Sequence, residues 1–246
     1  MILVLAHGRD LPARGWVDAW RGHDARMVTP ADLSRPGWQH YVGDSGPELA
    51  VASGQTISVS EIRGVVTRIP WLMPDDLPHV ADDDRGYVAS EINAFLVAWL
   101  CELRCPVINR PATNSLMGAP HSAEGWLVLA ARAGLTLSCT RRTFPAPAET
   151  AWPTDAITVS VLGGRCFGDV DPELANQACR LAALADVEML AVMFSHRAAG
   201  ATFQGAHLWP DISLPELSGA LLSRFVPAAA GLATLYLAAS TVRGRA

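Results

Sequence analysis

The pattern of apolar and polar positions at the start of the chain indicates a parallel sheet. Residues 2–6 form a continuous apolar run, which is typical of a strand that is buried on both faces. Residues 11–21 follow with two tryptophans four positions apart, as on one face of a helix. A second strand is predicted at residues 25–29 and a loop at residues 30–36. This strand–helix–strand order predicts an α/β fold with a right-handed crossover.

The next part of the chain continues the sheet and adds a hairpin and a long helix. Residues 49–53 and 56–60 flank a Gly-Gln pair and predict a β-hairpin. Another buried strand is predicted at residues 64–69, followed by a loop with five aspartates. Residues 87–103 keep the clearest helical period of the chain. A short strand at residues 106–109 follows, and we expect it to lie in the same sheet.

The second half is predicted to form a separate domain after a loop at residues 112–120. Helices are predicted at residues 122–133 and 172–185 and from residue 214 onward. Strands are predicted at residues 135–143, 157–162, 165–168, 187–194 and 201–208. Residues 144–153 hold three prolines and no periodicity, so they are a connector. We therefore expect two domains, residues 1–112 and residues 113–246.

Composition and charge narrow the class of protein. Hydrophobic residues make up 50% and charged residues 17% of the 246 positions, which excludes global disorder. The net charge of −5 argues against a nucleic-acid partner. Five cysteines without paired spacing indicate reduced thiols and a cytoplasmic location. The apolar residues 226–242 are too short for a convincing membrane span, so we expect a packed terminal helix and no membrane partner.

All 19 basic residues are arginine, and no lysine occurs anywhere in the chain. Arginine presents a rigid fork with a permanent charge, whereas lysine is a compact point charge with a tunable pKa. A chain without lysine therefore has no amine side chain for a Schiff base or for a nucleotide phosphate.

Several segments in a fixed order resemble the ATP-grasp ligases of the peptide-maturase and RimK-like type. In chain order they are GVVTRIPW (64–71), YVASEINAFLVAWL (87–100), PVINRP (106–111), HSAEGWLVLAARAGL (121–135), VLGGRCFG (161–168), LAVMFS (190–195) and FQGAHLWPDIS (203–213). The resemblance implies an N-terminal pre-ATP-grasp-like parallel-sheet domain and a reduced ATP-grasp-like α+β C-terminal domain. It also implies a homodimer.

The departures from this pattern concern the parts of the family that hold ATP. Family members insert a lid with nucleotide-binding lysines where this chain has only residues 144–156. They place an acidic residue near Met193 and magnesium-holding Glu and Asn side chains at the positions of Gly205 and His207. Hard divalent cations need clustered oxygen ligands, which these residues do not supply. We therefore expect neither a cofactor nor a bound metal.

Polar and aromatic residues after the predicted strands are candidates for ligand binding. Arg68 and Arg110 each follow a buried strand, where ligands bind in open α/β sheets. Together they are expected either to clamp a carboxylate or to form ion pairs with Glu91 or the acidic loop. Asn109 and Asn114 either add hydrogen bonds from the same rim or cap their loops.

Two tryptophans lie beside this proposed rim in the sequence. Trp71 comes two residues after the end of the strand predicted at residues 64–69, and Trp209 follows the last predicted strand of the chain. Both are expected to stack on a ligand.

Three residues are candidates for catalysis. His207 is expected to act as a base with Asp211 as the residue that orients it, unless the pair is an ordinary strand histidine and a turn aspartate. Cys166 follows Arg165, whose charge would favour a nucleophilic thiolate. The alternative is that Cys166 is a small core residue.

The residues leave two functions open. In the first, the cleft that corresponds to the ligase active site of the family carries out acid–base or acyl-type chemistry without ATP. Its substrate would be a small molecule or a peptide-like compound of a biosynthetic pathway. Alternatively, the chain is a non-catalytic partner of another biosynthetic enzyme. Fold alone decides neither.

Overall fold

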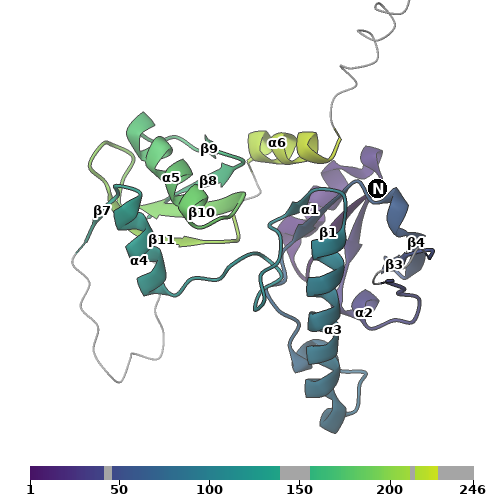
Figure 1. Ribbon diagram of the computed structural model, residues 1–246. Coiled ribbons are helices and arrows are strands. Elements are labelled where there is room, and N and C mark those ends of the chain that lie inside the picture. The colour runs from purple at the N-terminus through teal and green to yellow at the C-terminus, as the bar shows by residue number, and fades with distance from the viewer. Residues whose placement is uncertain (42–45, 139–155, 211–213, 227–246) are drawn as a thin grey trace, which may run out of the picture.

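The structure is a computed structural model that describes residues 1–41, 46–138, 156–210 and 214–226 (Figure 1). Two sheets with their own helices make up most of it, and the confirmed fold class is α/β with a parallel first sheet and a mixed second sheet. A separate two-stranded hairpin belongs to the first half of the chain, between β2 and β5 in the sequence.

The first sheet contains four parallel strands in the order β2-β1-β5-β6. Their bounds are β1 Ile2–Leu5, β2 Ala25–Val28, β5 Gly64–Thr67 and β6 Val107–Ile108. All of β1 and β5 is buried, as the continuous apolar runs predicted. Alternate side chains of β1 pack on opposite faces, so that Leu3 lies with the long helix α3 (Asp82–Glu102) and Val4 with α1 (Leu11–Ala19).

The predicted boundaries were wrong at two places, where the sequence pattern assigned acidic residues at the start of a helix to a loop. Residues 30–36 were expected to be a loop, but Pro30–Leu33 form the short helix α2, which Thr29 and Asp32 close with a capping box. Helix α3 begins five residues before the expected start, at Asp82. Three aspartates of the predicted acidic loop form its first turn, where the positive end of the helix dipole stabilises their negative charges.

The hairpin pairs β3 (Leu49–Ala52) with β4 (Gln55–Ser58) around a turn at Ser53 and Gly54. Both turn residues have positive φ, 51° and 74°, which matches the turn type that tight hairpins favour. Three 3₁₀ turns complete this half of the chain at η1 Arg21–His23, η2 Val59–Glu61 and η3 Pro74–Asp76.

The second sheet has five strands in the order β7-β11-β10-β8-β9. Their bounds are β7 Thr136–Leu137, β8 Ile157–Leu162, β9 Arg165–Phe167, β10 Met189–Phe194 and β11 Thr202–His207. Helices α4 (Ala123–Arg132) and α5 (Pro172–Leu184) pack on one face of this sheet. Most of the strand predicted at 135–143 and the connector after it lie outside the described residues.

Helix α6 (Pro215–Phe225) connects the two halves, as Figure 1 shows at the top of the molecule. Its Phe225 packs against Trp20 of the first half, with ring centroids 6.2 Å apart. Trp20 also donates a hydrogen bond from Nε1 to Ser218 Oγ at 3.1 Å. The last described helix of the chain therefore covers the first sheet, across the boundary predicted between residues 112 and 113.

None of the described helices combines the length and apolar character that a membrane span requires. Residues 227–246, which hold most of the apolar C-terminal stretch, lie outside the described residues.

Candidate functional site

The C-terminal end of β5 carries a buried arginine at the junction of the two sheets. The side chain of Arg68 is 8% exposed, and its Nε donates a hydrogen bond to Asp10 Oδ2 at 2.8 Å. Its guanidinium carbon lies 5.9 Å from the ring centroid of Trp16. The partner of Arg68 is therefore Asp10, and not Glu91 or the acidic loop as the sequence suggested.

One nitrogen of this guanidinium, Nη1, is not used in these contacts. Arg68 Nη1 is buried and has no hydrogen-bond partner within the described part of the chain. A buried donor without a partner costs about 1–3 kcal/mol, and more when it belongs to a charged group. Such an atom in a native fold calls for an explanation, and a ligand oxygen that accepts from Nη1 would supply one.

Asp10 is a site residue that the sequence analysis missed. Its Oδ1 accepts the backbone N–H of Ala13 at 2.9 Å and so caps helix α1, while its Oδ2 accepts from Arg68. The capping role was readable from an aspartate two residues before Pro12 at a helix start. The ion pair was not readable, because its two residues are 58 positions apart.

His207 lies at the end of β11 and is held by the backbone that follows it. Its Nδ1 accepts the backbone N–H of Trp209 at 3.2 Å, which assigns the proton of the neutral ring to Nε2. Burial lowers the pKa of His207 below its ordinary value, and the positive charge of Arg68 lowers this pKa further. The imidazole is thus neutral near pH 7 and carries an N–H donor on Nε2. The expected orienting residue, Asp211, lies outside the described residues.

The register of the second sheet sets a serine in the same row as this histidine. Ala191 of β10 pairs with Ser160 on one side and His207 on the other, and all three face away from α4 and α5. Two strand spacings separate Ser160 from His207, about 10 Å. Ser160 Oγ is buried without a hydrogen-bond partner among the described residues. No sequence motif marked this serine.

Trp209 ties the two sheets together at the site. Its indole Nε1 donates to the backbone oxygen of Arg68 at 3.3 Å, and the residue is 42% exposed. It therefore lies beside the candidate site. Trp71 is partly exposed after β5, and stacking of either ring on a ligand stays a prediction.

The two predicted asparagines have different surroundings. Asn109 is 3% exposed, and its amide donates to the backbone oxygen of Met189 at 2.9 Å and accepts from the Met189 N–H at 2.7 Å. It therefore joins β6 to β10 and is not on a rim. Asn114 is exposed in the turn between Ala112 and Ser115.

Arg110 does not share a site with Arg68 in this structure. Its guanidinium donates to the backbone oxygens of Cys101 at 3.2 Å and of Leu100 and Leu103 at 3.4 Å each. These carbonyls end helix α3, where a cation is favoured by the helix dipole. The expected clamp of two arginines is therefore replaced by one arginine at the junction and one at a helix end.

Cys166 is not activated as the sequence suggested. Burial raises the pKa of the Cys166 thiol to about 11, and the neighbouring Cys179 adds to the effect. Arg165 lies over the ring of Phe167 at 5.1 Å instead of beside the thiol. At pH 7 about one thiol in ten thousand is ionised, so Cys166 behaves as a core residue.

The positions that hold magnesium in the resembling ligases meet on β10 and β11. Met193 pairs with Gly205, and Ala191 pairs with His207, on the same face of the sheet. Glycine and methionine offer no oxygen ligand, and the chain has no lysine for the phosphates. Among the described residues no group of three or more His, Cys, Asp and Glu side chains is placed to hold a metal ion. These residues do not fit magnesium–ATP.

The junction therefore offers one unpartnered charged donor. Arg68 Nη1 has no hydrogen-bond partner among the described residues, and His207 lies near enough for the charge of Arg68 to lower its pKa. The natural complement of the guanidinium is a carboxylate. The arrangement is suited to binding such a group.

Comparison with known proteins supports the fold and little more. No protein-family model and no curated protein matches the chain. The macrocyclase MdnC from Microcystis aeruginosa MRC, solved with its precursor peptide MdnA, is 10% identical with a TM-score of 0.64, over 92% of this chain and 99% of that one. The ATP-grasp ligase PsnB, complexed with a minimal precursor, is 13% identical with a TM-score of 0.64, over 91% and 98%.

A third solved structure is a RiPP-associated ATP-grasp ligase of Chryseobacterium gregarium in complex with ADP and a leader and core peptide. It is 9% identical to this chain with a TM-score of 0.61, over 91% of this chain and 94% of that one. At such identities the likeness concerns the fold, and the chain has an ATP-grasp-like fold, as its sequence resemblance implied.

Proposed function

We propose that this chain is an ATP-independent binding protein of peptide-modifying biosynthesis, which holds a carboxylate of a peptide-like ligand at Arg68, beside His207. The observation that carries the proposal is the buried Nη1 of Arg68, which lacks a hydrogen-bond partner among the described residues. A ligand oxygen would satisfy this donor.

The independence from ATP rests on the identity of residues and not on an empty site. The chain has no lysine, and the two positions Met193 and Gly205 carry no oxygen ligand. The peptide-like nature of the ligand is supported by the similar structures, in which MdnC and PsnB are bound with precursor peptides. A homodimer stays a prediction.

Binding is favoured over catalysis because the candidate catalytic side chains are either in an unreactive protonation state or already hydrogen-bonded to the backbone. The thiol of Cys166 is protonated because its pKa is raised by burial. The Nδ1 of His207 accepts a backbone hydrogen bond, so this nitrogen is not available to take a proton from a substrate. Asn109 and Arg110 are committed to the backbone.

The second candidate function is an acid–base enzyme that uses His207. One observation favours it: the lowered pKa keeps the half-buried imidazole neutral near pH 7, and the neutral ring acts as a base once its Nδ1 releases the backbone N–H of Trp209. In that case His207→Gln would abolish turnover of a substrate that the variant still binds. If the protein only binds its ligand, there is no turnover to measure, and His207→Gln weakens binding alone.

The test of the proposed function uses two capped pentapeptides, acetyl-Ala-Ala-Glu-Ala-Ala-amide and its Gln counterpart. Calorimetry is expected to show that the Glu peptide binds about tenfold more tightly, since a charge-assisted hydrogen bond is worth more than a neutral one. Arg68→Lys keeps the charge opposite Asp10 but removes the guanidinium fork, so this preference should fall.

The matched control is Arg197→Lys, because Arg197 forms an exposed ion pair with Asp169 far from any ligand role in the proposal. It should bind both peptides like the unaltered protein. Equal affinity for both peptides, or a preference that survives Arg68→Lys, would rule out the proposed role of Arg68.

A further inference from the structure

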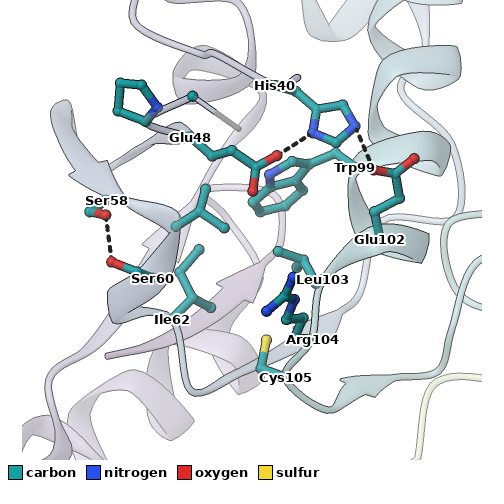
Figure 2. A pocket seen from close by; sticks show the side chains of 13 residues that line it. His40, Glu48, Ser58, Ser60, Ile62, Trp99, Glu102, Leu103, Arg104 and Cys105 are labelled. Atoms are coloured by element: carbon teal, nitrogen blue, oxygen red, sulfur yellow. Dashed lines mark hydrogen bonds and ion pairs between the residues drawn. The ribbon is translucent and has the colours of Figure 1, made fainter. Parts of the chain in front are cut away.

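A cavity lies in the N-terminal half, apart from the junction of the sheets. It has a volume of about 520 Å³ and is bounded by the segment before β3, the 3₁₀ turn after β4 and the C-terminal end of α3 (Figure 2). This volume falls in the range that suits a small organic ligand. None of the residues at the junction lines it.

One end of the cavity is acidic and holds a buried imidazole. His40 Nδ1 lies 2.8 Å from Glu48 Oε1, and His40 Nε2 lies 3.5 Å from Glu102 Oε2. The side chain of His40 is 6% exposed, whereas those of Glu48 and Glu102 are 36% and 53% exposed. Figure 2 shows the two carboxylates on opposite sides of the ring.

Two polar atoms at this end are buried without a hydrogen-bond partner among the described residues. They are His40 Nε2 and Trp99 Nε1, and both residues line the cavity. In the tautomer whose Nδ1–H donates to Glu48, the Nε2 atom carries a lone pair. It then faces Glu102, another acceptor, so neither atom satisfies the other. A cation with several N–H donors that lies beside these two acceptors, His40 Nε2 and Glu102 Oε2, would satisfy both.

The other end of the cavity is basic. Figure 2 places Arg104 and Cys105 at the side opposite His40, with Leu103 and Ile62 between the two ends. Arg104 is exposed and forms no ion pair with any described residue. The wall between the charged ends is largely apolar, with Ile62, Leu103 and the indole of Trp99, and the hydroxyls of Ser58 and Ser60 lie at one side of it (Figure 2).

We propose that this cavity binds a small zwitterion whose ammonium and carboxylate groups are separated by an apolar body. The ammonium lies beside Glu102 and His40, because its three donors can reach both acceptors at once. The carboxylate lies at Arg104, whose planar fork matches carboxylate geometry. The largely apolar wall covers the body of the ligand. This inference concerns a site that the proposed function does not use.

The test is calorimetry of the full chain with four probes. These are 6-aminohexanoate, its isomer L-norleucine with adjacent charges, hexylamine with only the cation and hexanoate with only the anion. We expect 6-aminohexanoate to bind about tenfold more tightly than each of the others, since each loses one charged contact. Equal binding of hexylamine, or no measurable binding of 6-aminohexanoate at millimolar concentration, would overturn the proposal.

Variants locate the binding in the cavity. Glu102→Gln should weaken 6-aminohexanoate about tenfold and leave hexanoate unchanged, whereas Arg104→Gln should weaken 6-aminohexanoate and leave hexylamine unchanged. The matched controls are Glu91→Gln, on an exposed position of the same helix, and Arg132→Gln on α4. A loss of affinity in the controls as large as in the cavity variants would contradict the assignment.

The outcome is independent of the proposed function. Arg68→Lys should leave the affinity for 6-aminohexanoate unchanged, because Arg68 does not line this cavity. A cavity that binds no probe would leave the peptide experiment at Arg68 intact, and the reverse also holds.

Discussion

Arg68 and Asp10 form an ion pair at the C-terminal edge of the first sheet, in which Arg68 Nε donates to Asp10 Oδ2 at 2.8 Å and both side chains are largely buried. The same aspartate caps helix α1. One carboxylate therefore fixes both the start of a helix and the orientation of the arginine that the proposed function requires.

Removing this carboxylate should destabilise the protein. Asp10→Ala leaves the buried Arg68 without a charge partner and removes the cap of α1, so we expect a loss of about 3–5 kcal/mol in the free energy of unfolding. Urea denaturation measures it. Asp18→Ala removes an exposed pair with Arg21 and should change the free energy of unfolding by less than about 1 kcal/mol. Similar losses in the two variants would show that the Asp10 pair is not structural.

The contact of Asn109 with Met189 should hold the two sheets together. Asn109→Ala leaves the buried N–H and carbonyl of Met189 without partners, at a cost of about 2–4 kcal/mol in the free energy of unfolding. The exposed Asn114 provides the matched variant, and Asn114→Ala should stay within about 0.5 kcal/mol of the unaltered protein. Thermal unfolding measures the stability of both variants, and equal midpoint temperatures would contradict a bridging role for Asn109.

Cys166 should react slowly with iodoacetamide near neutral pH. Because burial raises the pKa of its thiol to about 11, little thiolate is present, and the rate should rise about tenfold for each pH unit toward that value. A variant that keeps only Cys166 can be compared with one that keeps only Cys101, which is exposed. Labelling of Cys166 as fast as of Cys101 at pH 7 would refute the assignment of Cys166 to the core.

Protonation of His207 should link stability to pH in a defined window. The pKa of His207 is lowered in the folded state, so the unfolded chain binds its proton first as the pH falls. The stability it contributes is complete above about pH 6.5, the ordinary histidine value, and is lost as the pH falls through the folded pKa.

His207→Gln should flatten this part of the pH–stability curve. The ring proton signals of His207 in an NMR titration give the folded pKa directly. A midpoint at or above the ordinary histidine value would show that burial and Arg68 do not act on the ring as described.

The local elements could be predicted from the sequence, but the contacts between them could not. The apolar run at β1 and the Gly-Gly turn before β9 follow from periodicity and turn chemistry, and both were confirmed. The start of α3 was missed because three aspartates read as a solvated loop. In the first turn of α3 their negative charges are instead stabilised by the helix dipole.

The candidate site was predicted in part for the same reason. The position of Arg68 after a buried strand identified it, because strand ends of a parallel sheet meet at one edge. The role of Arg110 was not predictable, since only the fold shows that it reaches the end of α3. The cavity at His40 was missed as well, because Glu48 and Glu102 lie 54 positions apart in the chain and approach one ring only after folding.

The central claim is that an ATP-grasp-like fold here binds its ligand without nucleotide. The most direct measurement is calorimetry with magnesium–ATP, followed by titration of the Glu pentapeptide in the absence of nucleotide. We expect no heat of binding from magnesium–ATP and a saturable heat from the peptide. A micromolar dissociation constant for magnesium–ATP, or peptide binding that appears only when nucleotide is present, would contradict the account.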